Sequence, residues 1–307
     1  MSDFGRTALA LTVCLAGCGQ AQESHSALAA GPTTPTAFAA AALHVDFGTA
    51  ANPTPARDAQ GNPQTKNEIA SALTHAAPPA PREACPNGMA HVSDYCIDRY
   101  EAYVVELDDA GAEHAHSPYA PVDGLRVRAK VAEAVVPQGY ISQVEARAAC
   151  ENAGKRLCSA PEFSLACRGP DAKAAYPYGG TRRQAGKCNE GKGSAVSVVF
   201  GALANYGSQQ LNDPRLNQWP GGLAKTGAFA ESASPFGVFD LVGNLHEWSA
   251  EVAPNGHGFF HGGFYGDAEI NGSGCNYVTK AHATNYHDYS TGFRCCKDAD
   301  SSHDDAH

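Results

Sequence analysis

The stretch that decides the fold reads Phe236-Gly-Val-Phe-Asp-Leu-Val-Gly-Asn-Leu-His-Glu-Trp248. Apolar residues lead into a Gly-Asn pair at which the chain is expected to turn. Two carboxylates, Asp240 and Glu247, stand on either side of this pair. Ca²⁺ binds several carboxylate and carbonyl oxygens on a backbone that bends, so the spacing predicts a structural calcium site. Its candidate ligands are Asp240, Gly243, Leu245 and Glu247. The alternative is a turn residue at Asp240 and a surface charge at Glu247.

This stretch resembles a family signature. Asp-Leu-Val-Gly-Asn-Leu-His-Glu-Trp is similar to the "GN-x-W-E-W" motif of the formylglycine-generating enzymes, the sulfatase-modifying factors. Other segments resemble further motifs of that family, in the family's order, and together they cover roughly residues 85 to 297. These segments are Cys96-Ile-Asp-Arg-Tyr-Glu101, Ala153-Gly-Lys-Arg-Leu157 with Ala160-Pro-Glu-Phe163, Tyr176-Pro-Tyr-Gly179 and Gly292-Phe-Arg-Cys295. The resemblance strengthens the calcium prediction, and it suggests that Asn189 and Glu190 are one half of the family's other calcium site.

The resemblance implies a single α+β, loop-rich domain with short strands, related to the C-type-lectin-like architecture. Two helices can be predicted from the residues themselves, over about 142–153 and 159–168. Each begins with a capping box, Ser142-Gln-Val-Glu145 and Ser159-Ala-Pro-Glu162, and each ends at a glycine. At helical spacing, the first helix carries Val144, Ala148 and Ala149 as its expected inner face, and the second carries Phe163, Ala166 and Cys167.

Composition limits the function and the compartment. The formal net charge is −10, and a nucleic-acid-binding protein normally shows a basic face, so we expect no nucleic-acid partner. Eleven cysteines without a C-x₂-C pair indicate disulfides in an oxidising compartment.

The N-terminal segment predicts export. Residues 1–18 contain a short apolar run that ends in Leu15-Ala-Gly-Cys18, which looks like a bacterial lipobox with Cys18 as the lipidated residue. An ordinary signal peptide cut nearby is the alternative. Residues 19–82 read as an Ala/Pro/Thr-rich disordered tether, residues 83–297 as the folded domain, and residues 298–307 as an acidic, His-containing disordered tail. We expect a lipid anchor at the cell envelope (periplasm or outer membrane) or secretion.

The cysteines of the domain predict a disulfide framework. The resemblance implies bonds from Cys150 to Cys295 and from Cys167 to Cys275, which tie both helices to the C-terminal segment. By elimination, Cys85 is assigned to Cys96 and Cys158 to Cys188, which leaves Cys296 over. Connectivity does not follow from sequence, so these pairs are hypotheses.

The family's oxidase holds Cu(I) with two cysteines five residues apart, and soft Cu(I) prefers such thiolates. The matching region here reads Phe264-Tyr-Gly-Asp-Ala-Glu-Ile-Asn-Gly-Ser-Gly-Cys275, with Asp267 and Gly272 near the expected positions. No two cysteines of the chain have that spacing, and His246 replaces the first Trp of the signature. We therefore do not expect a copper centre.

Histidines of the C-terminal third could serve another metal. Together with Asp267 and Asp288 they would suit Fe(II) or Zn²⁺. The alternative is that they are hydrogen-bonded or surface residues. The histidines are His246, His257, His261, His282 and His287.

Two functions from different classes are compatible with these residues. The first is an exported binding or accessory lipoprotein, monomeric, whose ligand is a peptide, a protein or a glycan. The second is a metal-dependent oxidoreductase or maturation enzyme acting on an exported peptide, sulfatase or siderophore. For the first, aromatic residues would line the groove, although they could equally be core. The groove candidates are Trp248, Phe264, Tyr265, Tyr277, Tyr286, Asp267 and His282.

Overall fold

The computed structural model describes residues 85–202 and 205–299. The predicted leader, the predicted lipidation site Cys18 and the predicted tether lie outside the described residues. Within the part that is described, no helix has the length and apolar character that crossing a membrane requires.

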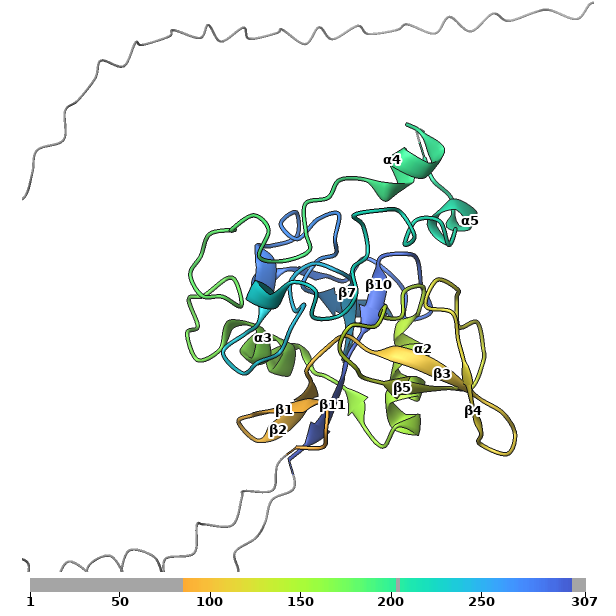
Figure 1. Cartoon of the computed structure of the whole chain (residues 1–307), viewed down its shortest axis with the longest axis horizontal. Helices are drawn as coiled ribbons and strands as arrows, with labels where there is room; N and C mark the ends of the chain where they lie inside the picture. Colours follow the sequence, from red (N-terminus) through yellow and green to blue (C-terminus); the bar gives the residue numbers. More distant parts are fainter. Residues whose placement is uncertain (1–84, 203–204, 300–307) are drawn as a thin grey trace, which may run out of the picture. The chain divides into compact units, whose positions relative to one another are not determined.

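The deciding stretch leads directly into a central four-stranded sheet with the order β10-β7-β8-β9 (Figure 1). Strand β7 runs parallel to β10, with Trp248 opposite Phe293, and antiparallel to β8. The first four residues of β7 are all buried, which explains why its sequence is not a simple apolar–polar alternation. The strands are β7 (His246–Val252), β8 (Gly258–His261), β9 (Val278–Thr279) and β10 (Thr291–Phe293).

A second four-stranded sheet has the order β1-β2-β11-β6 and is antiparallel throughout. The chain leaves β10 of the first sheet and enters β11 of the second after one residue, Arg294. The strands are β1 (Met89–Val92), β2 (Tyr95–Asp98), β6 (Arg156–Leu157) and β11 (Cys295–Asp298).

A third sheet, β4-β3-β5, packs against the first predicted helix (Figure 1). Buried Val104 on β3 and buried Ala129 on β5 face each other in the antiparallel register. The strands are β3 (Tyr103–Leu107), β4 (Glu113–Ala115) and β5 (Val127–Lys130).

Both predicted helices are present, as α2 (Gln143–Asn152) and α3 (Ala160–Arg168), and both capping boxes form. In each, the N-cap serine accepts from the amide of the glutamate three residues on, and that glutamate accepts from the serine amide. Phe163 and the rest of the predicted inner face of α3 are buried.

The predicted inner face of α2 is partly wrong. Val144 is 48% exposed and Ala148 is also exposed, while Gln143 is buried. The Gln143 amide donates to the carbonyl oxygens of Ser249 and Glu251, at 2.6 and 2.7 Å, so a polar residue takes the inward position. These bonds join α2 to the C-terminal half of β7.

Short helical turns complete the described part and lie mostly in its loops. Helices α4 and α5 contact each other. They are α4 (Ala195–Phe200), α5 (Ser208–Leu211), and the 3₁₀ turns η1 (Ala230–Ser232) and η2 (Gly274–Asn276).

Four disulfides link these elements. Three predicted pairs are confirmed: Cys85–Cys96, Cys150–Cys295 and Cys167–Cys275. The predicted pair Cys158–Cys188 is wrong. Cys158 is bonded to Cys296, because β6 pairs with β11 and brings the two Cα atoms to 4.8 Å, and Cys188 is a buried free thiol.

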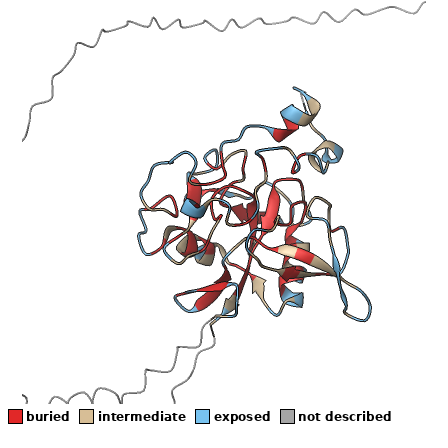
Figure 2. Ribbon diagram, viewed as in Figure 1, coloured by how far each residue is buried: buried red, intermediate tan, exposed pale blue. Residues whose placement is uncertain are grey.

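Buried residues concentrate where the central sheet meets α2 and α3 (Figure 2). One apolar cluster surrounds α3 and the disulfides Cys158–Cys296 and Cys167–Cys275, and a second surrounds α2 and Trp248. A third, aromatic cluster contains Tyr140, Tyr265 and Tyr289. The predicted α+β, loop-rich, disulfide-stapled fold is confirmed. The third cluster borders a cavity that Asp267 also lines.

Candidate functional site

Arg294 lies at the junction of the two four-stranded sheets and is fully buried. Its guanidinium donates to both carboxylate oxygens of Glu247 on β7, at 2.5 Å from Nε and 2.7 Å from Nη2. It also donates to the carbonyl oxygens of Asp98 and Phe239, at 3.0 and 2.9 Å. Arg294 therefore joins β7, the end of β2 and the deciding stretch, and it supplies the positive charge beside Glu247.

The two predicted carboxylate ligands of calcium, Asp240 and Glu247, are bonded to protein donors in this fold. Both oxygens of Glu247 accept from Arg294. The oxygens of Asp240 accept from the Gly227 amide at 2.7 Å and from the Ser232 hydroxyl at 3.1 Å. Each carboxylate is therefore already bonded to protein donors, and the nearby cation is a guanidinium.

The other two predicted ligands, Gly243 and Leu245, belong to a tight turn. At Gly243 φ is +81°, and a Cβ there would clash with the Asn189 carbonyl oxygen, so only glycine fits. The side-chain amide of Asn244 donates to the carboxylate of Glu101 at 2.5 Å, and the backbone N–H of Leu245 donates to it at 2.9 Å. The two residues after Gly243 are therefore both bonded to the buried carboxyl group of Glu101, the last residue of the Cys96-Ile-Asp-Arg-Tyr-Glu101 motif.

Burial raises the pKa of Glu101 well above its usual value, and the charges of Asp240 and Glu247 raise it further.

The two residues of the second predicted calcium site, Asn189 and Glu190, are also bonded within the protein. The side-chain amide of Asn189 donates to the carbonyl oxygen of Gly222 and to the side-chain oxygen of Asn244. Glu190 accepts from Arg183 at 2.5 Å.

A cavity of about 430 Å³ opens beside the third, aromatic cluster. This size is typical of small-ligand pockets. Its walls come from the segment before α4, the loop after β8, the end of η2 and the segment before β10. We call it the Asp267 pocket. Its lining residues are Gly193, Ser194, Phe264, Gly266, Asp267, Ile270, Asn271, Tyr277 and Tyr289.

A chain of hydrogen bonds runs from the core to this pocket. The Ser290 hydroxyl donates to Asp288 Oδ1 at 2.7 Å. His246 Nδ1 lies 3.2 Å from that hydroxyl oxygen, and His246 Nε2 lies 3.2 Å from the hydroxyl of Tyr277. Asn271 Nδ2 donates to the same Tyr277 oxygen at 3.1 Å. The pocket-lining phenol is therefore positioned by an imidazole held in the core.

His246 is packed against the rings of Phe260, Phe264 and Tyr277, with centroids 4.5 to 5.3 Å away. Burial, together with a smaller effect of nearby His282, lowers the pKa of His246 to about 3. Burial also raises the pKa of Tyr277, and nearby Asp267 adds to the rise. Both groups are consequently neutral at neutral pH.

The positions expected for copper ligands lie at or near this pocket. Asp267 lines it, and Gly272 follows on the same loop. At Gly272 φ is +113° and a Cβ would lie 2.5 Å from the Asn276 carbonyl oxygen, so the backbone does not accommodate a side chain there. No cysteine lines the pocket among the described residues.

The groove candidates separate into three groups. Phe264, Asp267 and Tyr277 line the pocket. Trp248 and Tyr265 are core residues whose polar atoms donate to the carbonyl oxygens of Ile141 and Leu216.

The two remaining candidates, His282 and Tyr286, stack on each other with ring centroids 3.9 Å apart. The Tyr286 hydroxyl donates to Asp288. Neither ring is among the lining residues of the Asp267 pocket.

The five histidines are not brought together as a metal centre. In residues 85–202 and 205–299, no group of three or more His, Cys, Asp or Glu side chains is arranged to hold a metal ion. His261 bonds the Ser249 hydroxyl, and His287 Nδ1 bonds the Asn212 side chain. His257 bonds the Lys280 carbonyl oxygen.

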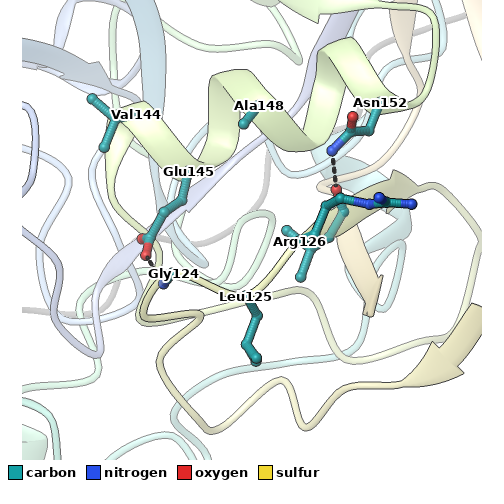
Figure 3. Close-up of a pocket in the computed structure, with 8 residues that line it drawn as sticks. Gly124, Leu125, Arg126, Val144, Glu145, Ala148 and Asn152 are labelled. Carbon is teal, nitrogen blue, oxygen red and sulfur yellow. Dashed lines mark hydrogen bonds between the residues drawn. The ribbon is translucent and has the colours of Figure 1, made fainter. Parts of the chain in front are cut away.

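A second cavity, of about 340 Å³, lies on the outer face of α2 (Figure 3). Val144 and Ala148, predicted as core, line it together with Leu125. Two of its polar side chains are bonded within the protein: Glu145 accepts from the Gly124 backbone N–H, and Asn152 donates to the Val127 carbonyl oxygen. Arg126 also lines the cavity, but no aromatic residue does, so this cavity is a weaker candidate than the Asp267 pocket.

Sequence reasoning missed several lining residues. Ser194 lies some seventy positions before the predicted groove segment. Tyr289 precedes the Gly292-Phe-Arg-Cys295 motif, which could have drawn attention to it. No feature of the sequence points to Asn271, because its role depends on its hydrogen bond to Tyr277 in the folded chain.

Comparisons with known proteins identify the domain. A family model described as the sulfatase-modifying factor enzyme 1-like domain matches residues 59–299. No curated protein matches the sequence.

Several solved structures are similar to this chain. PvdO from Pseudomonas aeruginosa has 16% identity and a TM-score of 0.40, over 66% of this chain and 80% of its own. The Major Tropism Determinant U1 variant has 15% identity and a TM-score of 0.40, over 70% and 53%. CarF has 17% identity and a TM-score of 0.37, over 68% and 88%. At these values the likenesses carry no argument about activity.

Proposed function

The chain belongs to the sulfatase-modifying factor enzyme 1-like family, and on that premise we propose that it is a ligand-binding or accessory member of the family. It acts at the Asp267 pocket and does not use a two-thiolate copper centre.

The observation that carries this proposal is the chemistry of the pocket. Three aromatic residues and a few polar groups line it, an arrangement typical of ligand sites. Eight of the nine described cysteines form disulfides, and burial, together with the charges of Glu190 and Asp240, raises the pKa of the remaining Cys188 to about 12. Cu(I) prefers thiolates, and the described pocket walls offer a carboxylate, an amide and hydroxyls instead.

Disulfides support an oxidising compartment as the place of action. Three of them close long loops, with sequence separations of 145, 138 and 108 residues. We propose an exported protein attached through a lipid on Cys18, or secreted, that meets a peptide, protein or glycan outside the cytoplasm. Calcium is not part of this proposal, because its predicted ligands are bonded to protein donors.

A fragment screen by amide NMR tests the proposal. We expect ligands to shift the resonances of the loop from Phe264 to Asn271, and Ser194→Trp to abolish these shifts by filling the pocket from its rim. Val144→Trp fills the second cavity and is the matched control. Shifts that survive Ser194→Trp would contradict the proposal. Stoichiometric iron or zinc in the purified protein would favour the metal-dependent oxidoreductase instead.

A further inference from the structure

Asp288 stands at the buried end of the hydrogen-bond chain that leads to Tyr277, and it fixes which group donates and which accepts in each bond. Asp288 is a carboxylate and only accepts, and it receives both the amide and the hydroxyl of Ser290, at 2.8 and 2.7 Å. The Ser290 oxygen is then free to accept from His246 Nδ1–H. A neutral imidazole with its proton on Nδ1 has a lone pair on Nε2. His246 therefore presents an acceptor to Tyr277.

Tyr277 has one proton, and the lone pair of His246 Nε2, 3.2 Å from its oxygen, accepts it. Asn271 donates to the same Tyr277 oxygen at 3.1 Å, which leaves one further acceptor position on that oxygen. Nearby Asp267 adds to the rise in the pKa of Tyr277. Since the phenol proton is given to His246, the remaining lone pair of Tyr277 is open to an N–H group of a ligand.

Asp267 makes the pocket electronegative. Its oxygens accept from the amides of Glu269 and Ile270, at 3.1 to 3.3 Å, and this leaves acceptor capacity on the carboxylate. The described lining residues include this one carboxylate and no Lys, Arg or His. The net charge of −10 adds a general attraction for cations.

Aromatic rings complete the walls. Phe264 and Tyr289 are in edge-to-face contact, with ring centroids 5.8 Å apart, and Tyr277 also lines the pocket. A cation beside such rings is attracted by their electron-rich faces. The side chain of Asp267, the oxygen of Tyr277 and these rings together match a positively charged group that carries N–H donors.

We propose that the Asp267 pocket binds an alkylammonium or alkylguanidinium group, with Asp267 and the Tyr277 oxygen accepting its N–H groups. This inference rests on the proposed function and names the ligand class of the same pocket. The shared chemistry can come from a free amine or guanidine, or from a Lys or Arg side chain of a peptide.

Isothermal titration of the full chain with four probes of similar size tests the ligand class. We expect butylammonium and butylguanidinium to bind, and butyramide and butyrate to bind at least about tenfold more weakly. A capped Gly-Arg-Gly peptide is the second arm. Binding of the peptide assigns a peptide side chain as the source, and binding of butylguanidinium alone assigns a small molecule.

Two variants and a matched control locate the effect. Asp267→Asn keeps an oxygen for the loop amides and should weaken cation binding about tenfold or more. Tyr277→Phe removes the acceptor oxygen and should weaken it about fivefold. Asp109→Asn makes the same charge change on an exposed turn away from the pocket and should leave binding unchanged. Thermal melts establish that each variant is folded.

The remaining outcomes separate the two proposals. If butyramide binds as tightly as the cations, or if Asp267→Asn binds as tightly as the wild type, the cation proposal is overturned and the ligand pocket stands. If fragments of every charge leave the loop from Phe264 to Asn271 unperturbed in the NMR screen, both the cation proposal and the proposed function are overturned.

Discussion

At the scale of single residues, the contact between Arg294 and Glu247 has the greatest consequence. Both side chains are almost completely buried, and their two parallel hydrogen bonds link the central sheet to the second sheet. Burial raises the pKa of Glu247, while Arg294 lowers it. Since a buried charge without its partner is costly, the pair acts as one unit.

Glu247→Gln should lower the free energy of unfolding by about 3–5 kcal/mol, because it leaves the Arg294 guanidinium without its counter-charge. Chemical denaturation measures the change. Arg215→Gln removes an exposed ion pair with Asp213 and is the control, with a much smaller expected change because solvent screens exposed charges. If both variants lost similar free energies of unfolding, the buried pair of Arg294 and Glu247 would not be the important link between the two sheets.

His261 predicts a pH dependence of stability. Burial lowers its pKa to about 4 from a usual value near 6.5. As pH falls below 6.5 the unfolded chain takes up a proton that the folded protein does not, so stability is lost between pH 6.5 and 4. At pH 5 the loss from this residue is about 2 kcal/mol.

His261→Gln should therefore lose about 2 kcal/mol less than the wild type between pH 7 and pH 5. Urea unfolding at the two pH values measures the difference. His91→Gln, at an exposed position, is the control and should follow the wild type. Equal pH dependence of all three proteins would contradict a neutral, buried His261.

At the scale of elements, local sequence determined the ends of both helices and the inner face of α3, but not the inner face of α2. The capping boxes at Ser142 and Ser159 are interactions over three residues, and both were predicted correctly. Val144 was assigned to the core wrongly, because the position of α2 depends on the bonds from Gln143 to β7. A buried glutamine has no apolar signature in the sequence.

Ser159→Ala should reduce the free energy of unfolding by about 1 kcal/mol, since the Glu162 amide loses its cap. Thermal and chemical denaturation measure this loss. Ser273→Ala is the matched control, because Ser273 stands at the N-cap of η2 without a side-chain cap bond. Its stability should equal that of the wild type, and a loss as large as that of Ser159→Ala would argue against the capping box.

The candidate site shows the same division between local and tertiary information. Phe264, Asp267 and Tyr277 lie in or just after the segment between the glycine pair and Cys275, and they were predicted near one another. The lining residue Ser194 comes from a remote loop, and sequence spacing carries no information on its position. The bonds of Asp240 could not be predicted for a similar reason, because Gly227 and Ser232 meet it only in the folded chain.

At the scale of the whole molecule, long-range disulfides hold a fold of short strands and loops. Cys158–Cys296 closes a loop with a sequence separation of 138 residues, against 11 for Cys85–Cys96. In the chain-entropy description, the longer loop contributes about 2 kcal/mol more stability. The elimination that assigned Cys158 to Cys188 ignored the pairing of β6 with β11.

Replacing both Cys158 and Cys296 by serine should therefore destabilise the protein by about 2 kcal/mol more than replacing both Cys85 and Cys96. Guanidinium denaturation of the two double variants measures the difference. Peptide mapping without reduction checks the connectivity directly. A peptide that joins Cys158 to Cys188 would refute the connectivity.

If the Asp267 pocket is a ligand site without copper-binding thiolates, the protein should not compete for Cu(I), and an anaerobic Cu(I) titration against a competing chelator measures this. Cys14 and Cys18 lie outside the described residues and are replaced by serine for this measurement. Since the described cysteines other than Cys188 are in disulfides, we predict that the protein leaves the copper with the chelator. One copper ion retained per chain, and released by Asp267→Ala, would contradict the account.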